Sequence, residues 1–194
     1  MNNMNVDDIV KVLNEKGKVV AIKTDTVYGL ICNALDVVAV SNIYKIKHRE
    51  SKKPLSIFVK DITIVDKYAD TSKLTAHGKS IMLRNWPGAL TVVFKKKDDT
   101  LKHLLSGLDS IGIRIPNDET LLEILDKVDF PLAETSCNIS GEKEFVSANE
   151  IKEAFGDKID LVVDGGIVNN NRPSTVISLE YDEPLVLRAG DVEV

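Results

Sequence analysis

Residues 47–55 read Lys-His-Arg-Glu-Ser-Lys-Lys-Pro-Leu, a basic stretch in a chain whose formal net charge is −5. Five basic residues fall within the nine positions 45–53, and they are Lys45, Lys47, Arg49, Lys52 and Lys53. Such a focus of positive charge in an acidic protein favours a site for a small anion such as phosphate. The stretch is too short to cover a nucleic-acid duplex.

The same stretch also has a purely structural interpretation. The spacing of apolar residues predicts an amphipathic helix from Asp36 to about Lys47. Basic side chains complement the dipole at a helix C-terminus, and Pro54 prevents the helix from continuing. Composition alone favours this solvated helix end. The polar segments elsewhere in the chain are what favour an anion site.

Length and composition predict a cytoplasmic globular protein. The 194 residues suffice for a single domain over residues 1–194, and 43% hydrophobic with 28% charged residues is ordinary for this class. No apolar run approaches the ~18 residues of a membrane span, and Met1–Asp8 lacks the apolar core of a signal peptide. Cys32 and Cys137 are expected to be free thiols. The three histidines lack metal-ligand spacing, so no metal site built from protein side chains is expected.

Strand and helix patterns alternate irregularly along the chain. Strands are predicted at residues 19–22, 55–59, 90–94, 111–115, 161–163, 175–179 and 185–187, with 55–59 expected to be buried. Besides 36–47, helices are predicted over 6–13, around 74–85, over 121–128 and from a capping box at Ser147–Glu150 through Phe155. Residues 23–30 are expected to form a polar turn, 131–135 to lead into a polar loop, and 169–173 to form a loop. We therefore expect an α/β domain with a twisted mixed β-sheet flanked by helices.

Polar segments follow or precede these apolar strands at several points. They cover residues 23–29, 47–54, 110–116, 135–141, 174–176 and 187–190. Ligands of α/β sheets usually bind where strand ends present loops. Each segment alone is also explained as an ordinary turn, so their combination carries the argument.

In this order the segments resemble the YrdC-type threonylcarbamoyl-AMP synthase family over nearly the whole chain. The matching motifs are Thr24-Asp-Thr-x-Tyr-Gly-Leu30, Lys47-x-Arg49 with Lys53-Pro-Leu55, Pro87-Gly88 with Thr91, Arg114-x-Pro116, Ser136-x-Asn138-x-Ser-Gly141, Ser174-Thr-Val176 and Leu187-Arg-x-Gly190. Two departures matter. Lys23 replaces the usual proline, and Phe58 stands where synthases often have histidine near the amino-acid pocket.

The resemblance implies an enzyme that joins L-threonine, bicarbonate and ATP into threonylcarbamoyl-adenylate and pyrophosphate. It implies that Lys47 and Arg49 are catalytic. The implied ATP-binding residues are Lys47, Arg49, Lys53, Ser110, Ser136, Asn138 and Arg188. The implied threonine-binding residues are Thr26, Phe58, Arg114 and Ser174. Mg²⁺ is expected with ATP, held mainly by phosphates and water.

The resemblance further implies a downstream partner, a transferase that uses the adenylate to modify tRNA. Two alternatives stay open. One is a double-stranded RNA-binding module that uses the basic surface, and a weak RNA contact is also compatible with the enzyme. The other is a family sibling that acts on a different carbamoyl-adenylate, which Phe58 keeps open.

Overall fold

The structure, a computed structural model, describes residues 5–50, 53–169, 172–181 and 183–194. Its α-helices are α1 (Val6–Asn14), α2 (Val37–Ile46), α3 (Val65–Tyr68), α4 (Ala76–Asn85), α5 (Glu119–Lys127) and α6 (Ala148–Phe155). Its strands are β1 (Val20–Lys23), β2 (Tyr28–Asn33), β3 (Ser56–Phe58), β4 (Leu90–Lys95), β5 (Ser110–Arg114), β6 (Leu132–Ser136), β7 (Leu161–Val162), β8 (Thr175–Ser178) and β9 (Leu185–Arg188). Short 3₁₀ turns occupy Ile62–Ile64, Lys102–Leu104 and Gly156–Lys158.

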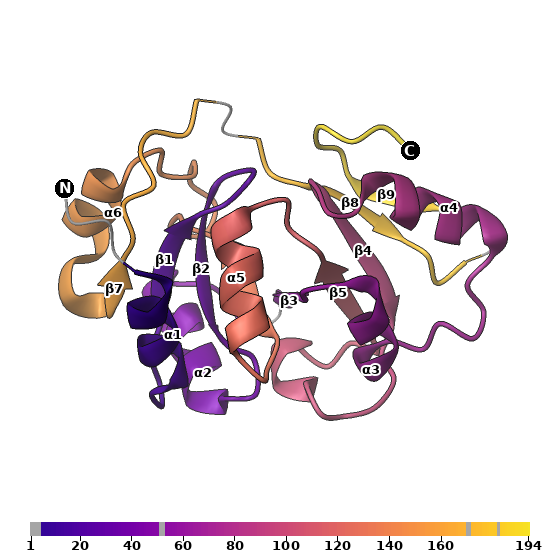
Figure 1. Cartoon of the computed structure of the whole chain (residues 1–194), viewed down its shortest axis with the longest axis horizontal. Helices are drawn as coiled ribbons and strands as arrows, with labels where there is room; N and C mark the ends of the chain where they lie inside the picture. Colours follow the sequence, from indigo (N-terminus) through magenta and orange to yellow (C-terminus); the bar gives the residue numbers. More distant parts are fainter. Residues whose placement is uncertain (1–4, 51–52, 170–171, 182) are drawn as a thin grey trace.

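All of these strands belong to one sheet, in the order β7-β1-β2-β6-β3-β5-β4-β8-β9. Three neighbouring pairs are parallel, namely β7 with β1, β3 with β5, and β4 with β8. The remaining pairs are antiparallel. Figure 1 shows β7, β1 and β2 on one side of the molecule and β4, β8 and β9 on the other. The predicted mixed sheet flanked by helices is confirmed.

Helices α1 and α5 cover half of one sheet face. They lie in front of the sheet in Figure 1 and pack against each other. Ile9 and Leu13 of α1 and Leu121 of α5 bury their side chains against strand residues such as Ile31 and Leu132. Burying one such side chain contributes about 1.5–3 kcal/mol. The site described below lies on the same face beside these two helices, over parts of β6, β3, β5, β4 and β8.

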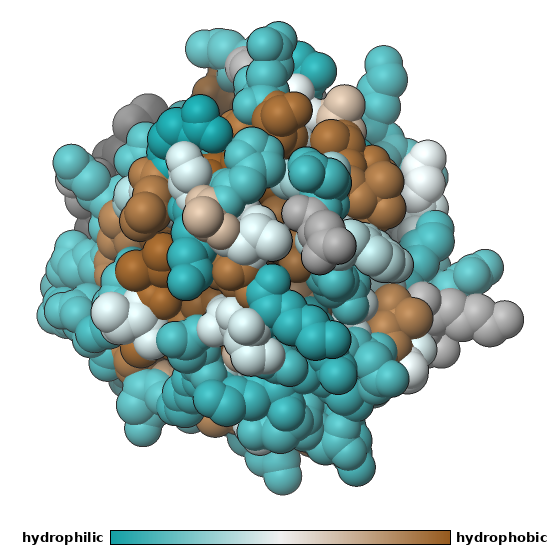
Figure 2. Space-filling view, turned by 90° about the vertical axis from the view of Figure 1, so that its right-hand side faces the viewer, coloured by the Kyte–Doolittle hydropathy of each residue, from teal (hydrophilic) through white to brown (hydrophobic). Residues whose placement is uncertain are grey.

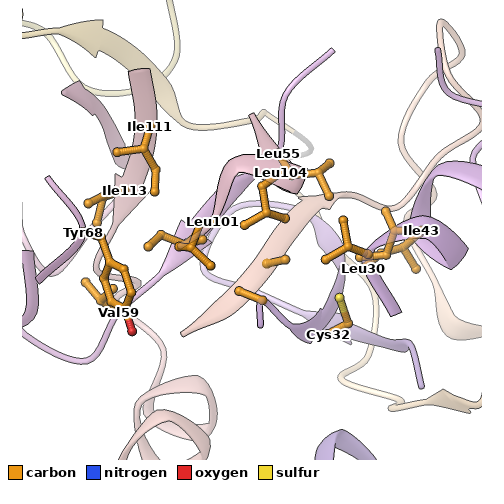
Figure 3. Close-up of a cluster of buried hydrophobic side chains, with 14 of the residues drawn as sticks. Leu30, Cys32, Ile43, Leu55, Val59, Tyr68, Leu101, Leu104, Ile111 and Ile113 are labelled. Atoms are coloured by element: carbon orange, nitrogen blue, oxygen red, sulfur yellow. The ribbon is translucent and has the colours of Figure 1, made fainter. Parts of the chain in front are cut away.

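The opposite face of the sheet carries the larger core. Helix α2 begins at Asp36, whose carboxylate caps the Val38 amide, and it buries Val40 and Ile43 against the sheet. Residues of α3, α4 and α6 complete this layer. In the part of this core drawn in Figure 3, Leu30 and Ile43 lie together while Tyr68 approaches Ile113. Because helices cover this face, the side chains that point to the other face of the sheet are free to form a site.

Two local predictions are wrong. The expected polar turn over 23–30 is confined to residues 24–27, because Tyr28, Gly29 and Leu30 already pair with β1 and β6 as the start of β2. The expected lead into a loop at 131–135 is strand β6, which β2 and β3 hold on both sides. Both segments contain polar residues because one face of each strand lines the site.

The predicted helix start at Ser147 is confirmed. Its hydroxyl accepts a hydrogen bond from the Glu150 amide at 3.3 Å. The Glu150 carboxylate reaches back to the Val146 amide at 2.9 Å, one residue before the cap. The loop expected at 169–173 includes residues 170 and 171, which lie outside the described residues.

Figure 2 looks at the side of the molecule that carries α4 and β9, where apolar patches lie among polar residues. Exposed apolar side chains on these elements include Leu83, Leu185 and Leu187. Within the described part of the chain, every helix is too short or too polar to cross a membrane.

Candidate functional site

A cavity of about 310 Å³ opens on the sheet face that α1 and α5 leave free. Its floor is formed by side chains that alternate to this face from neighbouring strands. These are Glu134 and Ser136 of β6, Ser56 and Phe58 of β3, Ser110, Gly112 and Arg114 of β5, Thr91 and Val93 of β4, and Val176 of β8. The walls come from the β1–β2 turn with Thr26, the segment after α2 with Arg49 and Pro54, Ser174 before β8, and Arg188 of β9.

Gly112 keeps the centre of the floor open. A Cβ atom at this position would lie 3.2 Å from the Ser56 Cβ and 3.5 Å from the Thr91 Cγ2. These two neighbours sit on the adjacent strands β3 and β4, so any side chain at 112 would fill the space between them. The cavity floor is therefore built from small polar residues around a glycine.

Arg114 is buried at the end of β5 and is held from three directions. Its Nη2 forms an ion pair with Asp25 at 2.6 Å, its Nη1 donates to the Thr26 hydroxyl at 3.1 Å, and its Nε donates to the Gly88 carbonyl at 2.9 Å. The Phe58 ring lies 5.6 Å from the guanidinium. The structure thus brings the predicted threonine-binding residues Thr26, Phe58 and Arg114 together. Phe58 supports the arginine by a cation–π contact.

Arg188 lies on the opposite wall and is fixed to the fourth predicted threonine-binding residue, Ser174. Its Nε and Nη2 donate to the Ser174 carbonyl at 3.0 and 2.8 Å, and Nη2 also contacts the Ser174 hydroxyl at 3.0 Å. That hydroxyl lies 2.9 Å from the Thr91 hydroxyl on the floor. The arginine is therefore oriented before any ligand arrives.

Arg49 lines the cavity just beyond the end of α2. Its Nη2 donates to the Pro54 carbonyl at 2.9 Å and its Nε to the Lys53 carbonyl at 3.3 Å. Burial lowers the pKa of Arg49 below its ordinary value, and the guanidinium still remains charged at neutral pH. Lys53 itself is exposed and does not line the cavity, although its carbonyl orients Arg49. Lys52 lies outside the described residues.

Lys47 is not at a solvated helix end, so that interpretation is wrong for this residue. Its side chain is 1% exposed. The ammonium group donates to the Ser136 carbonyl, to the Asn138 carbonyl at 2.9 Å and to the Asn138 Oδ1 at 2.7 Å. Burial, assisted by the nearby charge of Arg49, lowers the pKa of Lys47 to about 8.

The hydrogen bonds of Lys47 leave its ammonium group without a spare donor for the predicted phosphate contact. An ammonium group has three N–H donors, and the three acceptors just described can occupy them all. Lys47 also lies behind the Ser136–Asn138 segment and does not line the cavity. A direct phosphate contact stays a prediction, and it requires the ammonium group to exchange an acceptor for phosphate.

The two remaining predicted nucleotide residues of this segment differ in their exposure. Ser136 lines the cavity, and its hydroxyl donates to the Asn138 Oδ1 at 2.8 Å. Asn138 is buried and donates to the Glu142 carbonyl at 2.7 Å, so it shapes the segment from behind. Ser110 lines the cavity from β5. The structure gathers most of the predicted site residues around one cavity and leaves Lys47, Lys53 and Asn138 outside its lining.

Sequence reasoning missed three polar residues of the site. Asp25 lies within the quoted Thr-Asp-Thr motif, but its pairing with Arg114 joins residues far apart in the chain. Ser56 and Glu134 face each other across β3 and β6, and the Ser56 hydroxyl donates to the Glu134 Oε1. An acid at alternating positions with Leu132 and Ser136 would have been a usable signal, had 132–136 been recognised as a strand.

A cysteine nucleophile is not favoured at this site. Burial raises the pKa of Cys137 to about 12, so its thiol stays protonated at neutral pH. Chemistry in the cavity then depends on positioned charges and hydroxyl groups.

Comparison with known proteins agrees with this geometry. The family model Sua5_yciO_yrdC, described as telomere recombination, matches residues 12–190. A Methanocaldococcus jannaschii protein with the provisional name threonylcarbamoyl-AMP synthase is 40% identical over 178 residues, which are 92% of this chain and 82% of that protein. The threonylcarbamoyl-AMP synthase of Bacillus subtilis is 35% identical over 93% of this chain.

A solved structure of Pyrococcus abyssi Sua5 in complex with L-threonine superposes with a TM-score of 0.88 at 34% identity. The match covers 95% of this chain and 54% of the Sua5 chain. The present chain likewise covers 52% of the B. subtilis protein. It therefore corresponds to about half the length of these two relatives and to most of the M. jannaschii protein.

Proposed function

This chain belongs to the Sua5/YciO/YrdC family, and we propose that it is an L-threonylcarbamoyl-AMP synthase. The reaction joins L-threonine, bicarbonate and ATP and releases pyrophosphate. A nearby transferase would then use the adenylate to modify tRNA. The names of the relatives and the threonine complex of P. abyssi Sua5 support this proposal.

The observation that carries the proposal is the convergence of Arg49, Arg114 and Arg188 on one small cavity. Three guanidinium groups in a chain of net charge −5 favour a ligand with several negative charges. ATP with an amino-acid carboxylate meets this requirement. A cavity of about 310 Å³ also suits a small molecule better than a nucleic-acid duplex.

The arginine side chains that protein contacts hold in place fit two substrate subsites. Arg114 has five N–H donors, and three are used by Asp25, Thr26 and Gly88. The remaining donors can bind the threonine carboxylate beside Ser174. Arg49 and Arg188 then bind the phosphates from two sides of the cavity, with the Ser110 and Ser136 hydroxyls available to the nucleotide.

In the adenylation step, an oxygen of the carbamate group formed on the threonine nitrogen attacks the α-phosphorus. A new P–O bond forms, and the bond to the β-phosphate oxygen breaks to release pyrophosphate. Arginine forks bind the charge that grows on the phosphate oxygens. Fixing three reactants in one cavity supplies much of the acceleration, and no covalent enzyme intermediate is required.

Lys47 supports this site from behind in the proposed mechanism. By holding the Ser136 and Asn138 carbonyls it fixes the segment that presents the Ser136 hydroxyl. Mg²⁺ would enter with ATP. We expect it to be held mainly by phosphates and water.

Pyrophosphate release tests the proposed function. We expect release to require threonine and bicarbonate together, with threonylcarbamoyl-adenylate identified by mass spectrometry. Undiminished threonine-dependent release without bicarbonate would indicate simple aminoacyl adenylation instead. A panel of amino acids in the same assay identifies a sibling activity, and RNA binding without any pyrophosphate release would favour the RNA-binding module.

Arg49→Ala should lower turnover by about a hundredfold or more, because a preorganised charge facing the phosphates is lost. Arg49→Lys should not restore it, since an ammonium group cannot reproduce the planar fork. Arg84→Ala is the matched control, because Arg84 is exposed on α4 and bonds only the Ser80 carbonyl among the described residues. Rates of Arg49→Ala close to those of Arg84→Ala would remove Arg49 from the active site.

A further inference from the structure

Glu134 is the one acid among the described residues that line the cavity. Strand alternation puts it on the cavity face with Ser136, while Leu132 of the same face is covered by α5. The Ser56 hydroxyl donates to its Oε1, and its Oε2 has no hydrogen-bond partner among the described residues. A half-buried carboxylate is thus anchored at one oxygen and available at the other.

We propose that Glu134 binds the amino group of the amino-acid substrate and accepts the proton which this group must lose before it attacks carbon. The inference rests on the proposed function and assigns a catalytic residue within the same cavity.

The charges of the substrates explain why a carboxylate would be useful here. ATP, bicarbonate and the threonine carboxylate are all anions, and a carboxylate on the cavity floor repels each of them. Apart from the Mg²⁺ that would enter with ATP bound to its phosphates, the ammonium group of threonine is the one cationic group among the reactants. With the threonine carboxylate on Arg114, the amino group two bonds away remains free to reach a different part of the floor.

The charged surroundings favour loss of the ammonium proton. Lys47, Arg49 and Arg188 all interact electrostatically with Glu134, and Arg114 lines the same cavity. Glu144 is a second acid that interacts with Lys47 and Arg188. A further positive charge among these cations is disfavoured, so the neutral amine gains population when a base is at hand.

The proton balance of the step is simple. One ammonium proton passes to the Glu134 Oε2 and leaves a neutral amine. The amine lone pair attacks the bicarbonate carbon, so a C–N bond forms and a C–O bond breaks. The departing hydroxide takes a second amine proton and leaves as water, giving the carbamate anion. Glu134 later returns its proton to solvent.

A purely structural role is the competing explanation, in which Glu134 only balances the arginine charges. The pH profile separates the two. We would measure kcat/KM for threonine from about pH 6.5 to about pH 9 with ATP and bicarbonate saturating. Wild type, Glu134→Gln, Glu134→Asp and the exposed control Glu153→Gln would be compared.

We expect Glu134→Gln to lower kcat/KM for threonine by about a hundredfold or more near neutral pH. Its residual activity should rise about tenfold per pH unit, because only threonine that is already deprotonated in solution then reacts. Glu134→Asp keeps a carboxylate, so its kcat/KM should be reduced by a constant factor relative to wild type across this pH range, since the titration of Lys47 affects both proteins alike. Glu153→Gln should match wild type. A constant ratio between Glu134→Gln and wild type across this pH range would overturn the proposal.

Binding provides a test that needs no variant and no turnover. The threonine analogue in which a hydroxyl replaces the amino group should bind wild-type protein at least about tenfold more weakly than threonine in calorimetry. Equal affinities would overturn the proposal even if Glu134→Gln does not fold. If wild type releases no pyrophosphate with threonine and bicarbonate, the proposed function fails, and the same two affinities measured for wild type and Glu134→Gln still decide whether Glu134 recognises an amino group.

Discussion

At the scale of single residues, Lys47 shows how burial changes the meaning of a motif. The Lys-x-Arg pattern predicts two adjacent phosphate ligands, yet only Arg49 lines the cavity. Lys47 is enclosed by the Ser136 and Asn138 carbonyls and the Asn138 side chain. Where the chain leaves α2, it therefore places Lys47 inside the protein and Arg49 at the cavity.

Lys47 should make stability rise with pH in alkaline solution. Its folded pKa is about 8, against 10.5 for the free side chain, so the unfolded chain binds more protons between these values. The cost of burying the charge is then fully present below pH 8 and disappears as pH rises. The free energy of unfolding of wild type relative to Lys47→Met should increase by about 2 kcal/mol between about pH 8 and about pH 10.

Urea denaturation of both proteins across this pH range checks the expectation. Lys45→Met is the matched control, because Lys45 lies two residues earlier on α2 with its side chain exposed. Wild type relative to Lys45→Met should show no such increase. A constant difference between wild type and Lys47→Met would mean that the three acceptors keep the folded ammonium group charged throughout.

The sequence allowed many residues of the site to be identified, but it did not show which of them contact one another. Arg114, Thr26 and Ser174 could be selected from motifs, because each motif is a short run in the sequence. The partners of Arg114 could not be selected in this way, since Asp25 and Arg114 are 89 positions apart and meet only through the sheet. Glu134 was missed because its strand was taken for the approach to a loop.

At the scale of elements, the connection around β8 and β9 depends on one close backbone approach. A Cβ atom at Gly190 would lie 2.3 Å from the Thr175 amide nitrogen and 2.6 Å from the Pro173 carbonyl oxygen. The Gly190 amide also donates to the Thr175 hydroxyl at 3.0 Å. This contact sets Ser174 and Arg188 against each other at the cavity wall.

Gly190→Ala should therefore affect both stability and activity. The clash is with backbone atoms, so the two segments must separate, at a cost of about 1–3 kcal/mol in the free energy of unfolding. Separation also moves Arg188 away from Ser174, and pyrophosphate release should fall. Urea denaturation and initial rates measure the two effects, with Ala189→Ser at the exposed neighbouring position as control. Wild-type behaviour of Gly190→Ala would show that the close approach is dispensable.

Elements with a continuous apolar signal were predicted well, including β4 and β5 of the site, whereas β2 and β6 were not. Strands β4 and β5 bury one face in the core and were found near their observed bounds. Strand β2 was partly assigned to a turn because Tyr28 and Gly29 follow a run of polar residues. Its strand character comes from pairing on both sides with β1 and β6, which local propensity does not contain.

At the scale of the whole molecule, the cavity joins parts of the chain that have no local connection. Arg49 follows α2, Arg114 ends β5 and Arg188 lies on β9 near the edge of the sheet. Between them the floor crosses β6, β3, β5 and β4 in the middle of the sheet. A ligand bound to all three arginines would therefore connect the centre of the sheet with its edge strand.

ATP binding should consequently stabilise the fold as a unit. At about a hundred times its Kd, ATP should raise the free energy of unfolding by about 2.7 kcal/mol, because the ligand binds only the folded chain. Hydrogen exchange should slow both in the segment after α2 and in β8–β9, since the phosphates would contact Arg49 and Arg188 from these two places. In Arg49→Ala the gain at the same ATP concentration should shrink, while Arg84→Ala should retain it. Protection restricted to one of the two segments would place the nucleotide on one wall only and would contradict a site shared between Arg49 and Arg188.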